Sequence, residues 1–280
     1  MFCFKSSLIN KSTKNAVNRE LDVLKYFNTL ELQQRNHIIK MDDWEREDKK
    51  MYFVLELGGK TLKNYFHQKV HERNGHININ NIKKEQLLLT NILKGAAQAL
   101  QQFHQHGIHL DVKENNFVIA LDENQSEPNP TSTETIPVKL IDFNISVITK
   151  RVHTPYFLNM AQTNKAPEII NNNPSNVDVW SFGLMVYSLY NYHEFSIYSN
   201  NEDIMGIVHN NEDIDQNDSL NRLIKACVQI VPSGRPKMEE IVQFLNGEIE
   251  YFELKRTDLK KSNVEKKNIV EIGFSVDYVE

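Results

Sequence analysis

The stretch His106–Phe117 constrains this chain more than any other, because it gathers three different polar groups within a few positions. Asp111 supplies a carboxylate, Lys113 an ammonium group and Asn116 an amide, and apolar residues lie on both sides of them. Groups of these kinds, held close together, can position a hydroxyl group and phosphate oxygens. The sequence therefore predicts a polar site built on a single loop.

The spacing of this stretch resembles the catalytic loop of protein kinases, H-R-D-x-K-x-x-N. His109, Asp111, Lys113 and Asn116 stand at its fixed positions, and Leu110 replaces the arginine. Other kinase landmarks follow in order: Asp142-Phe143-Asn144 for D-F-G, Ala166-Pro167-Glu168 for A-P-E, the run Asp178–Gly183, and Gly234-Arg235-Pro236. Each match is weak alone, but four in order over most of the chain indicate a protein kinase fold.

The resemblance implies an α+β, bilobal protein-kinase-like fold. We expect an incomplete, small, β-rich N-lobe over residues 1–57, a mainly helical C-lobe over 58–246 and a charged extension over 247–280. The chain has 280 residues, 40% of them hydrophobic, which is enough for two coupled lobes with real cores. Its net charge of −5 gives no electrostatic reason to expect a nucleic acid as partner.

Cysteine usage and apolar runs bear on the compartment. Cys3 and Cys227 are too few for a disulfide framework and fit a reducing compartment. The first residues reach the charge of Lys5 before the apolar core of a signal peptide can form. The longest apolar run, 177–190, is interrupted by Asp178 and is too short to span a bilayer. We therefore expect a cytoplasmic or nuclear protein without a membrane partner, and the oligomeric state stays open.

Alternating and helical patterns outline the N-lobe. We expect a short strand over 2–5, a helix over Asn15–Phe27, and paired strands over 37–44 and 50–56 that a charged turn separates. The second of these paired strands ends at Gly58-Gly59. In a kinase this point is the hinge, whose backbone groups bind adenine.

The resemblance also implies residues that bind ATP. Lys5 would pair with Glu20 on the N-lobe helix and hold the α- and β-phosphates. The rest of the ATP-binding set would be Leu55, Glu56, Leu57 and Val118. For Lys5 and Glu20 the alternative is a surface lysine and a solvated glutamate.

The catalytic and metal-binding residues come from the same resemblance. Asp111 would accept the hydroxyl proton of a protein substrate, and Lys113 would steady the transferring phosphoryl group. Asn116 and Asp142 would hold Mg²⁺, because amide and carboxylate oxygens are the ligands that Mg²⁺ takes alongside substrate phosphates.

Helical patterns dominate the C-lobe. We expect a short helix over 61–69, a long core-facing helix over 82–105, a strand over 117–120 and a polar loop over 121–137. The stretch 138–144 should be a strand followed by the D-F-G position at Asp142. Asn144 replaces the glycine of D-F-G, and we expect it to adopt a positive φ at a cost of about 1 kcal/mol. A last helix over 238–245 follows Arg235, which we expect to form a buried pair with Glu168.

Two groups of histidines admit a metal site. The first group has no further ligands nearby, and we interpret it as a solvated helix end: His67, His71 and His76. The second group is His104, His106 and His109. His109 stands at the structural histidine of the catalytic-loop pattern, so we assign it a structural role instead.

The choice of kinase class rests on a few further residues. Lys113 is typical of serine/threonine kinases. The nearest subfamily is the monopolar-spindle, or TTK-type, checkpoint kinases, which the chain resembles in 37–44, 52–58, 104–108, 116–117 and 140–145. That resemblance implies a role in the mitotic spindle checkpoint.

Two functions remain open. One is an active, divergent serine/threonine kinase that uses ATP and Mg²⁺, with Lys5, Asp111, Asn116 and Asp142 all retained. The other is a pseudokinase that acts as a binding scaffold. The scaffold is favoured by the absent glycine-rich loop, by Asn144 and by the segment 160–165, which lacks the G-T-x-x-Y pattern of substrate docking. Leu110 lacks the guanidinium that would bind a phosphate on the activation loop, so we do not expect that form of switching.

The sequence before Lys5 holds only four residues, too few for the glycine-rich loop that covers ATP phosphates in kinases. Backbone N–H groups of that loop supply several hydrogen bonds to the phosphates, each worth about 1.5–3 kcal/mol. We therefore expect a Mg-ATP titration of the 280-residue chain to show weak binding.

Two explanations are open for the short N-terminus: a start position assigned too late, or loss of the loop in this lineage. We favour the first, and expect the coding DNA upstream of Met1 to encode a G-x-G-x-x-G segment. Tight ATP binding by the chain as written, or upstream DNA without such a segment, would contradict this expectation.

Overall fold

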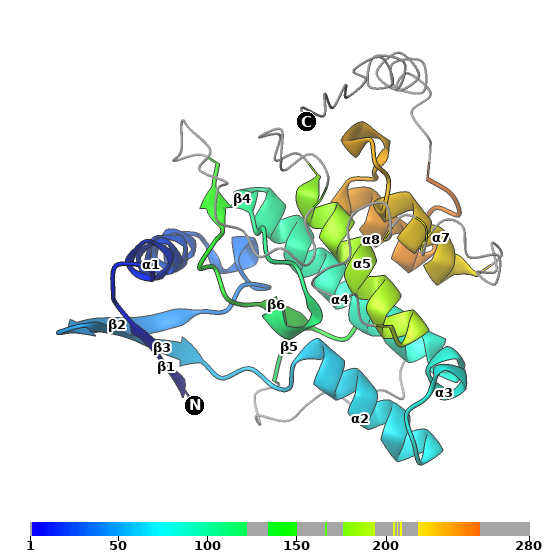
Figure 1. Cartoon of the computed structure of the whole chain (residues 1–280), viewed down its shortest axis with the longest axis horizontal. Helices are drawn as coiled ribbons and strands as arrows, with labels where there is room; N and C mark the ends of the chain where they lie inside the picture. Colours follow the sequence, from blue (N-terminus) through cyan, green and yellow to red (C-terminus); the bar gives the residue numbers. More distant parts are fainter. Residues whose placement is uncertain are drawn as a thin grey trace, which may run out of the picture.

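The computed structural model describes residues 2–121, 134–149, 166, 176–193, 204, 206, 208 and 218–252. They form a small β-rich part and a larger helical part (Figure 1). Most of the expected polar loop, the segment 160–165, Glu168 and the chain beyond 252 lie outside the described residues. Within the part that the structure describes, none of the helices has the length and apolar character needed to cross a bilayer.

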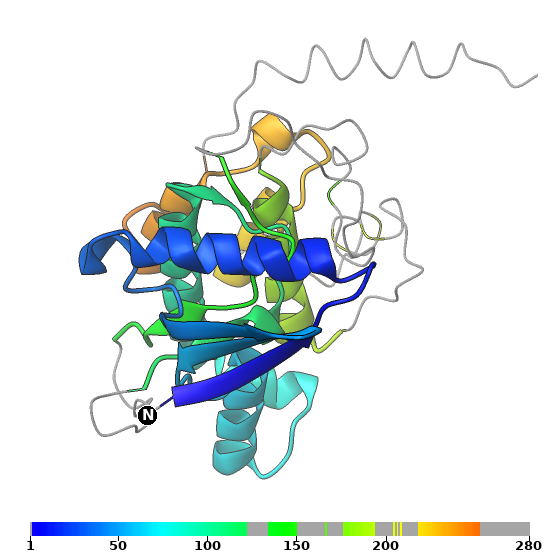
Figure 2. The same cartoon turned by 90° about the vertical axis from the view of Figure 1, so that its left-hand side faces the viewer.

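Three antiparallel strands and one helix make up the small part. Strands β1 (Phe2–Leu8), β2 (Met41–Glu47) and β3 (Lys50–Glu56) form a sheet in the order β1-β3-β2. Helix α1 (Lys14–Asn28) lies next to these strands (Figure 2). The apolar stripe of α1 is buried, as its sequence pattern requires. The expected N-terminal strand, helix and second paired strand are therefore confirmed, and β1 runs on to Leu8.

Helices and short strand pairs make up the larger part. Strand β4 (Gly107–Ile108) pairs with β7 (Val147–Ile148), and β5 (Phe117–Ile119) pairs with β6 (Val138–Leu140). Helix α5 is almost wholly buried among the others, which accounts for its continuous apolar sequence. The helices are α2 (Leu62–Asn74), α3 (Ile79–Lys84), α4 (Gln86–His104), α5 (Val177–Asn191), α7 (Ser219–Cys227) and α8 (Met238–Asn246).

Gln102 on α4 joins the two parts with every polar atom of its side chain. Its Nε2 donates to the carbonyl of Gln33 at 2.9 Å and to Oδ1 of Asn36 at 2.7 Å, and its Oε1 accepts from the backbone of His37 at 2.9 Å. The carbonyl of His37 in turn accepts from Leu140 in β6. Because a buried amide is costly unless it is hydrogen-bonded, this arrangement fixes the segment 33–37 against the helical part.

The same contacts explain why the strand expected over 37–44 was misplaced. The backbone of His37 and of Ile39 bonds to Leu140, so β2 starts only at Met41. At its other end β2 continues through the residues expected to turn, and the turn is confined to Asp48 and Lys49, with Asp48 at a φ of 50°.

One further expectation about element bounds was wrong. The helix expected over 82–105 is broken at Glu85, where α3 ends and α4 begins, and Leu87 is exposed rather than core-facing. The strand expected before Asp142 is confirmed as β6, which ends at Leu140. The last helix is confirmed, with α8 covering Met238–Asn246.

Arg235 is buried where α5 meets the segment before α8. Only 3% of the residue is exposed. Its guanidinium donates to the carbonyls of Gln229 at 2.8 Å and Asn176 at 3.1 Å, and lies 5.0 Å from the ring centre of Trp180. Glu168, the expected partner, lies outside the described residues. The carbonyl contacts alone indicate that Arg235 holds this junction together.

Replacing Arg235 by alanine should lower the free energy of unfolding by about 3 kcal/mol, because the buried carbonyls lose a charged donor. Lys237→Ala changes an exposed residue two positions away and should stay within about 0.5 kcal/mol of the parent chain. Urea denaturation measures both. Small and equal effects would show that Arg235 does not hold the junction.

Candidate active site

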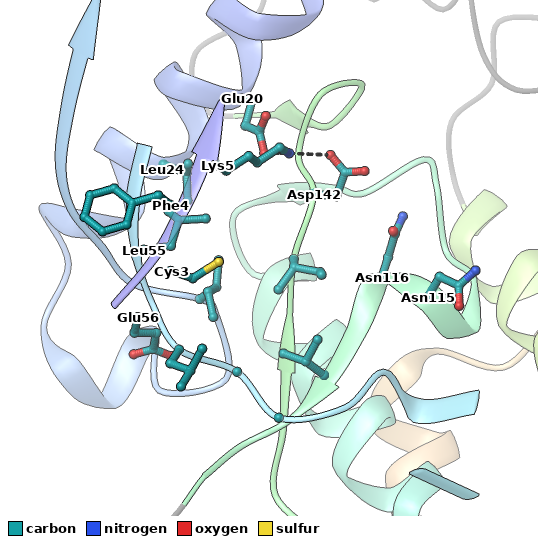
Figure 3. A pocket seen from close by; sticks show the side chains of 16 residues that line it. Cys3, Phe4, Lys5, Glu20, Leu24, Leu55, Glu56, Asn115, Asn116 and Asp142 are labelled. Atoms are coloured by element: carbon teal, nitrogen blue, oxygen red, sulfur yellow. Dashed lines mark hydrogen bonds and ion pairs between the residues drawn. The ribbon is translucent and has the colours of Figure 1, made fainter. Parts of the chain in front are cut away.

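A cavity of about 520 Å³ opens between the small sheet and the loop that precedes β5 (Figure 3). In Figure 3 the side chains of Asp142 and Asn116 lie on one side of it, and those of Phe4 and Leu55 on the other. The cavity thus brings residues from both parts of the chain around one space.

Lys5 is the polar centre of the cavity. Its Nζ lies 2.6 Å from Oε1 of Glu20 on α1 and 3.2 Å from Oδ1 of Asp142, which is far along the chain. Only 4% of the Glu20 side chain is exposed. The alternative of a surface lysine and a solvated glutamate is therefore wrong, and the predicted pairing of Lys5 with Glu20 is present.

The electrostatics of this cluster follow from burial and charge. Burial raises the pKa of Glu20 above its ordinary value, although the Lys5 ammonium acts in the opposite direction. Burial lowers the pKa of Lys5, but the two carboxylates of Glu20 and Asp142 outweigh it, so the pKa lies above its ordinary value. Lys5 is therefore a firmly held positive charge, suited to binding phosphate oxygens.

Asp111, Lys113 and Asn116 also meet, as the loop pattern predicts. Asp111 Oδ2 accepts from Lys113 Nζ at 2.6 Å and from Asn116 Nδ2 at 2.8 Å. Asn116 Nδ2 donates further to the carbonyl of Asp111 at 2.7 Å. The amide nitrogen of Asn116 is thus held by the loop itself, which leaves its side-chain oxygen as the group that can bind a cation in the cavity.

Asp178, at the start of α5, holds the backbone of this loop. Its Oδ2 accepts from the N–H of His109 at 2.7 Å and from Nε2 of His104 at 2.9 Å, while Oδ1 accepts from the N–H of Leu110 at 2.7 Å. Burial by itself raises the pKa of Asp178, but these donors outweigh it, and the pKa lies below its ordinary value. Asp178 therefore positions Asp111 without lining the cavity.

In the sequence Asp178 is recognisable as the first residue of the run Asp178–Gly183, but its contact with the loop was not predicted. The signal was available, because a carboxylate inside an apolar helix must find donors elsewhere in the chain. The sequence alone did not show which groups donate hydrogen bonds to Asp178.

His109 is wholly buried, and its hydrogen bonds suit a neutral ring. Its Nδ1 accepts from the N–H of Asp111 at 3.3 Å, and its Nε2 lies 3.2 Å from the carbonyl of Ile141, to which it donates in the neutral form. Burial lowers its pKa, despite the neighbouring carboxylates of Asp178, Asp111 and Asp142. The ring packs edge-on against Phe143 and Phe103.

The turn at Asp142-Phe143-Asn144 differs from the expectation. The positive φ belongs to Asp142, at 65°, and Asn144 is not among the described residues with positive φ. The strain expected at Asn144 was therefore misplaced. Phe143 is buried and stacks on Phe103 at 5.6 Å. This packing, together with the tolerance of aspartate for left-handed backbone, allows the turn without glycine.

The hinge residues line the cavity where the resemblance placed them. Leu55, Glu56, Leu57 and Val118 all border it. Gly58 was noted only as a flexible position, but a Cβ atom there would lie 2.6 Å from Cγ2 of Val118. Glycine is therefore required for this close approach of the hinge to β5.

Further lining residues were not predicted. Cys3 is on the same face of β1 as Lys5, because alternate residues of a strand share a face. Because side chains alternate between the two faces of a strand, the position of Lys5 could have identified Cys3 as a lining residue. Other lining residues that sequence reasoning did not single out are Leu24, Ile39 and Ile141.

Known proteins resemble this chain over most of its length. The family model described as Protein kinase domain matches residues 2–245. Calcium-dependent protein kinase 32 of Arabidopsis thaliana is 24% identical over 199 residues, 65% of this chain and 30% of that protein. A probable serine/threonine-protein kinase of Dictyostelium discoideum is 27% identical over 216 residues, 70% of this chain and 31% of that protein.

Serine/threonine-protein kinase 33 of Bos taurus is 26% identical over 192 residues, 64% of this chain and 33% of that protein. The chain spans about a third of the length of each of these three relatives.

The buried, neutral His109 should make stability fall as the pH drops. Its folded pKa lies below the ordinary value of 6.5, so between these two values the unfolded chain binds more protons than the folded one. Stability should decrease as the pH falls below 6.5, by up to about 1.4 kcal/mol per pH unit for this proton.

His109→Leu should flatten that decrease, whatever its effect on stability at pH 7. The exposed His71→Leu serves as the control and should keep the slope of the parent chain. Urea denaturation between pH 7 and pH 5 measures the slopes. Parallel curves for the parent chain and His109→Leu would show that His109 is not the titrating group.

Proposed function

This chain belongs to the protein kinase family, and we propose that it is a serine/threonine protein kinase that transfers the γ-phosphate of ATP to hydroxyl groups of proteins. The observation that supports this most is the position of Lys5, whose ammonium contacts both Glu20 and Asp142 at the edge of a cavity. A lysine that contacts the buried Glu20 on one side and Asp142 on the other is suited to holding phosphate oxygens.

The residues of the cavity would bind different parts of Mg-ATP. Lys5, oriented by Glu20, would bind the α- and β-phosphates, and the backbone of Leu55–Leu57 would face the adenine ring. Mg²⁺, when bound with ATP, neutralises charge on the phosphates. The side-chain oxygen of Asn116 and the carboxylate of Asp142 are the groups that would hold it.

Asp111 and Lys113 would act on the substrate hydroxyl, which accepts the phosphoryl group. The carboxylate of Asp111 would take the proton of the substrate hydroxyl, while Lys113, 2.6 Å from that carboxylate, would steady the transferring phosphoryl group. Both residues are held by contacts within their own loop. The proposed catalysis is therefore mainly positioning and charge neutralisation.

A binding scaffold without phosphotransfer is the second candidate. The altered sequence of 160–165 favours it. Asn144, which the sequence offered as a second ground for a scaffold, does not favour it, because the turn there has its positive φ at Asp142. Against this candidate stands the cluster at Lys5, which a scaffold has no chemical need to keep.

A role in the mitotic spindle checkpoint is the narrower proposal. It rests on the sequence resemblance to TTK-type kinases. The relatives found by comparison are two calcium-dependent protein kinases of Arabidopsis thaliana and kinases named without that role, and they add no support. A cytoplasmic or nuclear location likewise stays a proposal from cysteine usage.

Asp111→Asn should abolish phosphate transfer while leaving the fold intact, because the change is nearly isosteric and removes the proton acceptor. The assay uses Mg-ATP and a generic protein substrate, with the thermal melting temperature measured alongside. Asp22→Asn, at an exposed position of α1, is the control and should keep full activity.

Full activity in Asp111→Asn would exclude Asp111 as the proton acceptor. A large drop in melting temperature would assign it a structural role. An inactive parent chain that binds Mg-ATP would favour the scaffold.

A further inference from the structure

A hydrogen bond links the helix that carries Glu20 to the larger, helical part of the chain. Tyr26 lies on α1 less than two turns beyond Glu20, and its hydroxyl is 2.9 Å from Nδ1 of His106. Both residues are buried, with exposed fractions of 9% for Tyr26 and 5% for His106. A polar contact at this depth is directional and poorly replaced by water.

His106 stands where three functional segments meet. It follows α4 and precedes β4, which leads into the loop of Asp111. Its carbonyl accepts from Thr149, at 3.0 Å from the backbone nitrogen and 3.1 Å from Oγ1. Thr149 in turn lies just beyond β7, in the segment that follows Asp142. His106 therefore contacts α1 through its ring and the segment after Asp142 through its backbone.

The apolar contacts around this pair are extensive but less directional. Phe27, next to Tyr26, stacks on Phe103 at 5.2 Å and packs edge-on against His106 at 5.5 Å. Such packing holds α1 near the larger part, but it is less directional than a hydrogen bond. Asn28, by contrast, donates to the carbonyl of Met41 and so bonds within the small part. The contact of Tyr26 with His106 crosses between the parts.

We propose that Tyr26 and His106 form a positioning pair, which sets the rotation of α1 so that Glu20 stays on Lys5. The proposal rests on the proposed kinase function, because its purpose is to keep Lys5 ready for the phosphates of ATP. Neither residue lines the cavity, so both act through Glu20. The direction of the hydrogen bond depends on the tautomer of His106, and either direction serves this role.

Loss of the pair should be visible at Lys5 itself. When Glu20 moves away, the Lys5 amine loses the carboxylate that lies 2.6 Å from it and that covers it on the side of α1. The amine is then more accessible to an acylating reagent. The rate at which Lys5 is acylated therefore reports the position of Glu20 without any need for phosphate transfer.

The experiment compares Tyr26→Phe with Tyr52→Phe in the full chain. Tyr52 lies on β3 in the same small, β-rich part of the chain as Tyr26, so its variant controls for the loss of a hydroxyl from this part. An amine acylating reagent is applied near pH 9, and the modified lysines are followed by mass spectrometry. Kinetic constants for ATP and melting temperatures are measured on the same samples.

In Tyr26→Phe we expect Lys5 to be acylated several times faster, while Lys40, which lies outside α1, keeps its rate. The value of kcat/KM for ATP should fall about tenfold, the equivalent of one hydrogen bond. Tyr52→Phe should match the parent chain in both measurements. If all lysines react faster together, Tyr26 only stabilises the fold, and the positioning role is overturned.

Variants of His106 test the pair from the other side. His106→Leu should reproduce the effect of Tyr26→Phe on Lys5, and the double variant Tyr26→Phe with His106→Leu should add no further increase. His106→Asn keeps an acceptor close to the position of Nδ1 and should restore most of the parent rate. Additive effects of the two single changes would overturn the proposal.

The two proposals can fail separately. A parent chain that transfers no phosphate would contradict the proposed function. The acylation rates would still show whether Tyr26 and His106 keep Glu20 in contact with Lys5. Unchanged acylation of Lys5 in Tyr26→Phe would overturn the positioning pair, even if the chain proved to be an active kinase.

Discussion

The buried carboxylate of Asp178 is the constraint on which the rest of the site depends. A charge with almost no exposed surface is strongly unfavourable unless donors surround it, and three donors do so here. Two of them are the backbone N–H groups of His109 and Leu110, so satisfying the carboxylate also fixes the path of the loop. Leu110 takes a φ of 71°, a conformation that a leucine rarely adopts without such support.

The fixed loop then positions the other residues of the site through a series of contacts. Asp111 follows Leu110 directly, and its side chain and carbonyl hold Asn116. The carbonyl of Asn116 accepts from the N–H of Ile141 at 2.9 Å, which places Asp142 beside it. Asp142 finally contacts Lys5 of the small sheet. A continuous path of hydrogen bonds and ion contacts therefore runs from the core of the helical part to the edge of the cavity.

Local sequence predicted the parts of this path that lie close together in the chain. The spacing of Asp111, Lys113 and Asn116 was enough, since a short loop has few ways to separate them. The kinase-like α+β fold was also predictable and is confirmed by the match to the Protein kinase domain. The pairing of Lys5 with Glu20 needed the resemblance, because nothing local joins a strand residue to a helix residue across a connecting segment.

The errors have a common physical origin in contacts that are distant in sequence. The helix expected over 82–105 breaks at Glu85, whose carboxylate bonds to Arg73 and Asn74 at the end of α2. The strand β2 starts late because His37 and Ile39 are bonded to Leu140. The positive φ moved from Asn144 to Asp142, beside Phe143 in its stack with Phe103. In each case tertiary contacts outweighed a sound local preference.

Leu110 indicates that the catalytic loop is not ordered by phosphorylation. An apolar side chain that is 8% exposed offers no guanidinium to a phosphate, so we do not expect phosphorylation to order the loop through this residue. Asp178 already holds this loop through its hydrogen bond with the N–H of Leu110. The ring of His109 anchors the loop further by packing against Phe143 and Phe103. The segment 33–37 is held by Gln102, and α1 contacts His106 through Tyr26. The contacts that order the site are therefore built into the described fold.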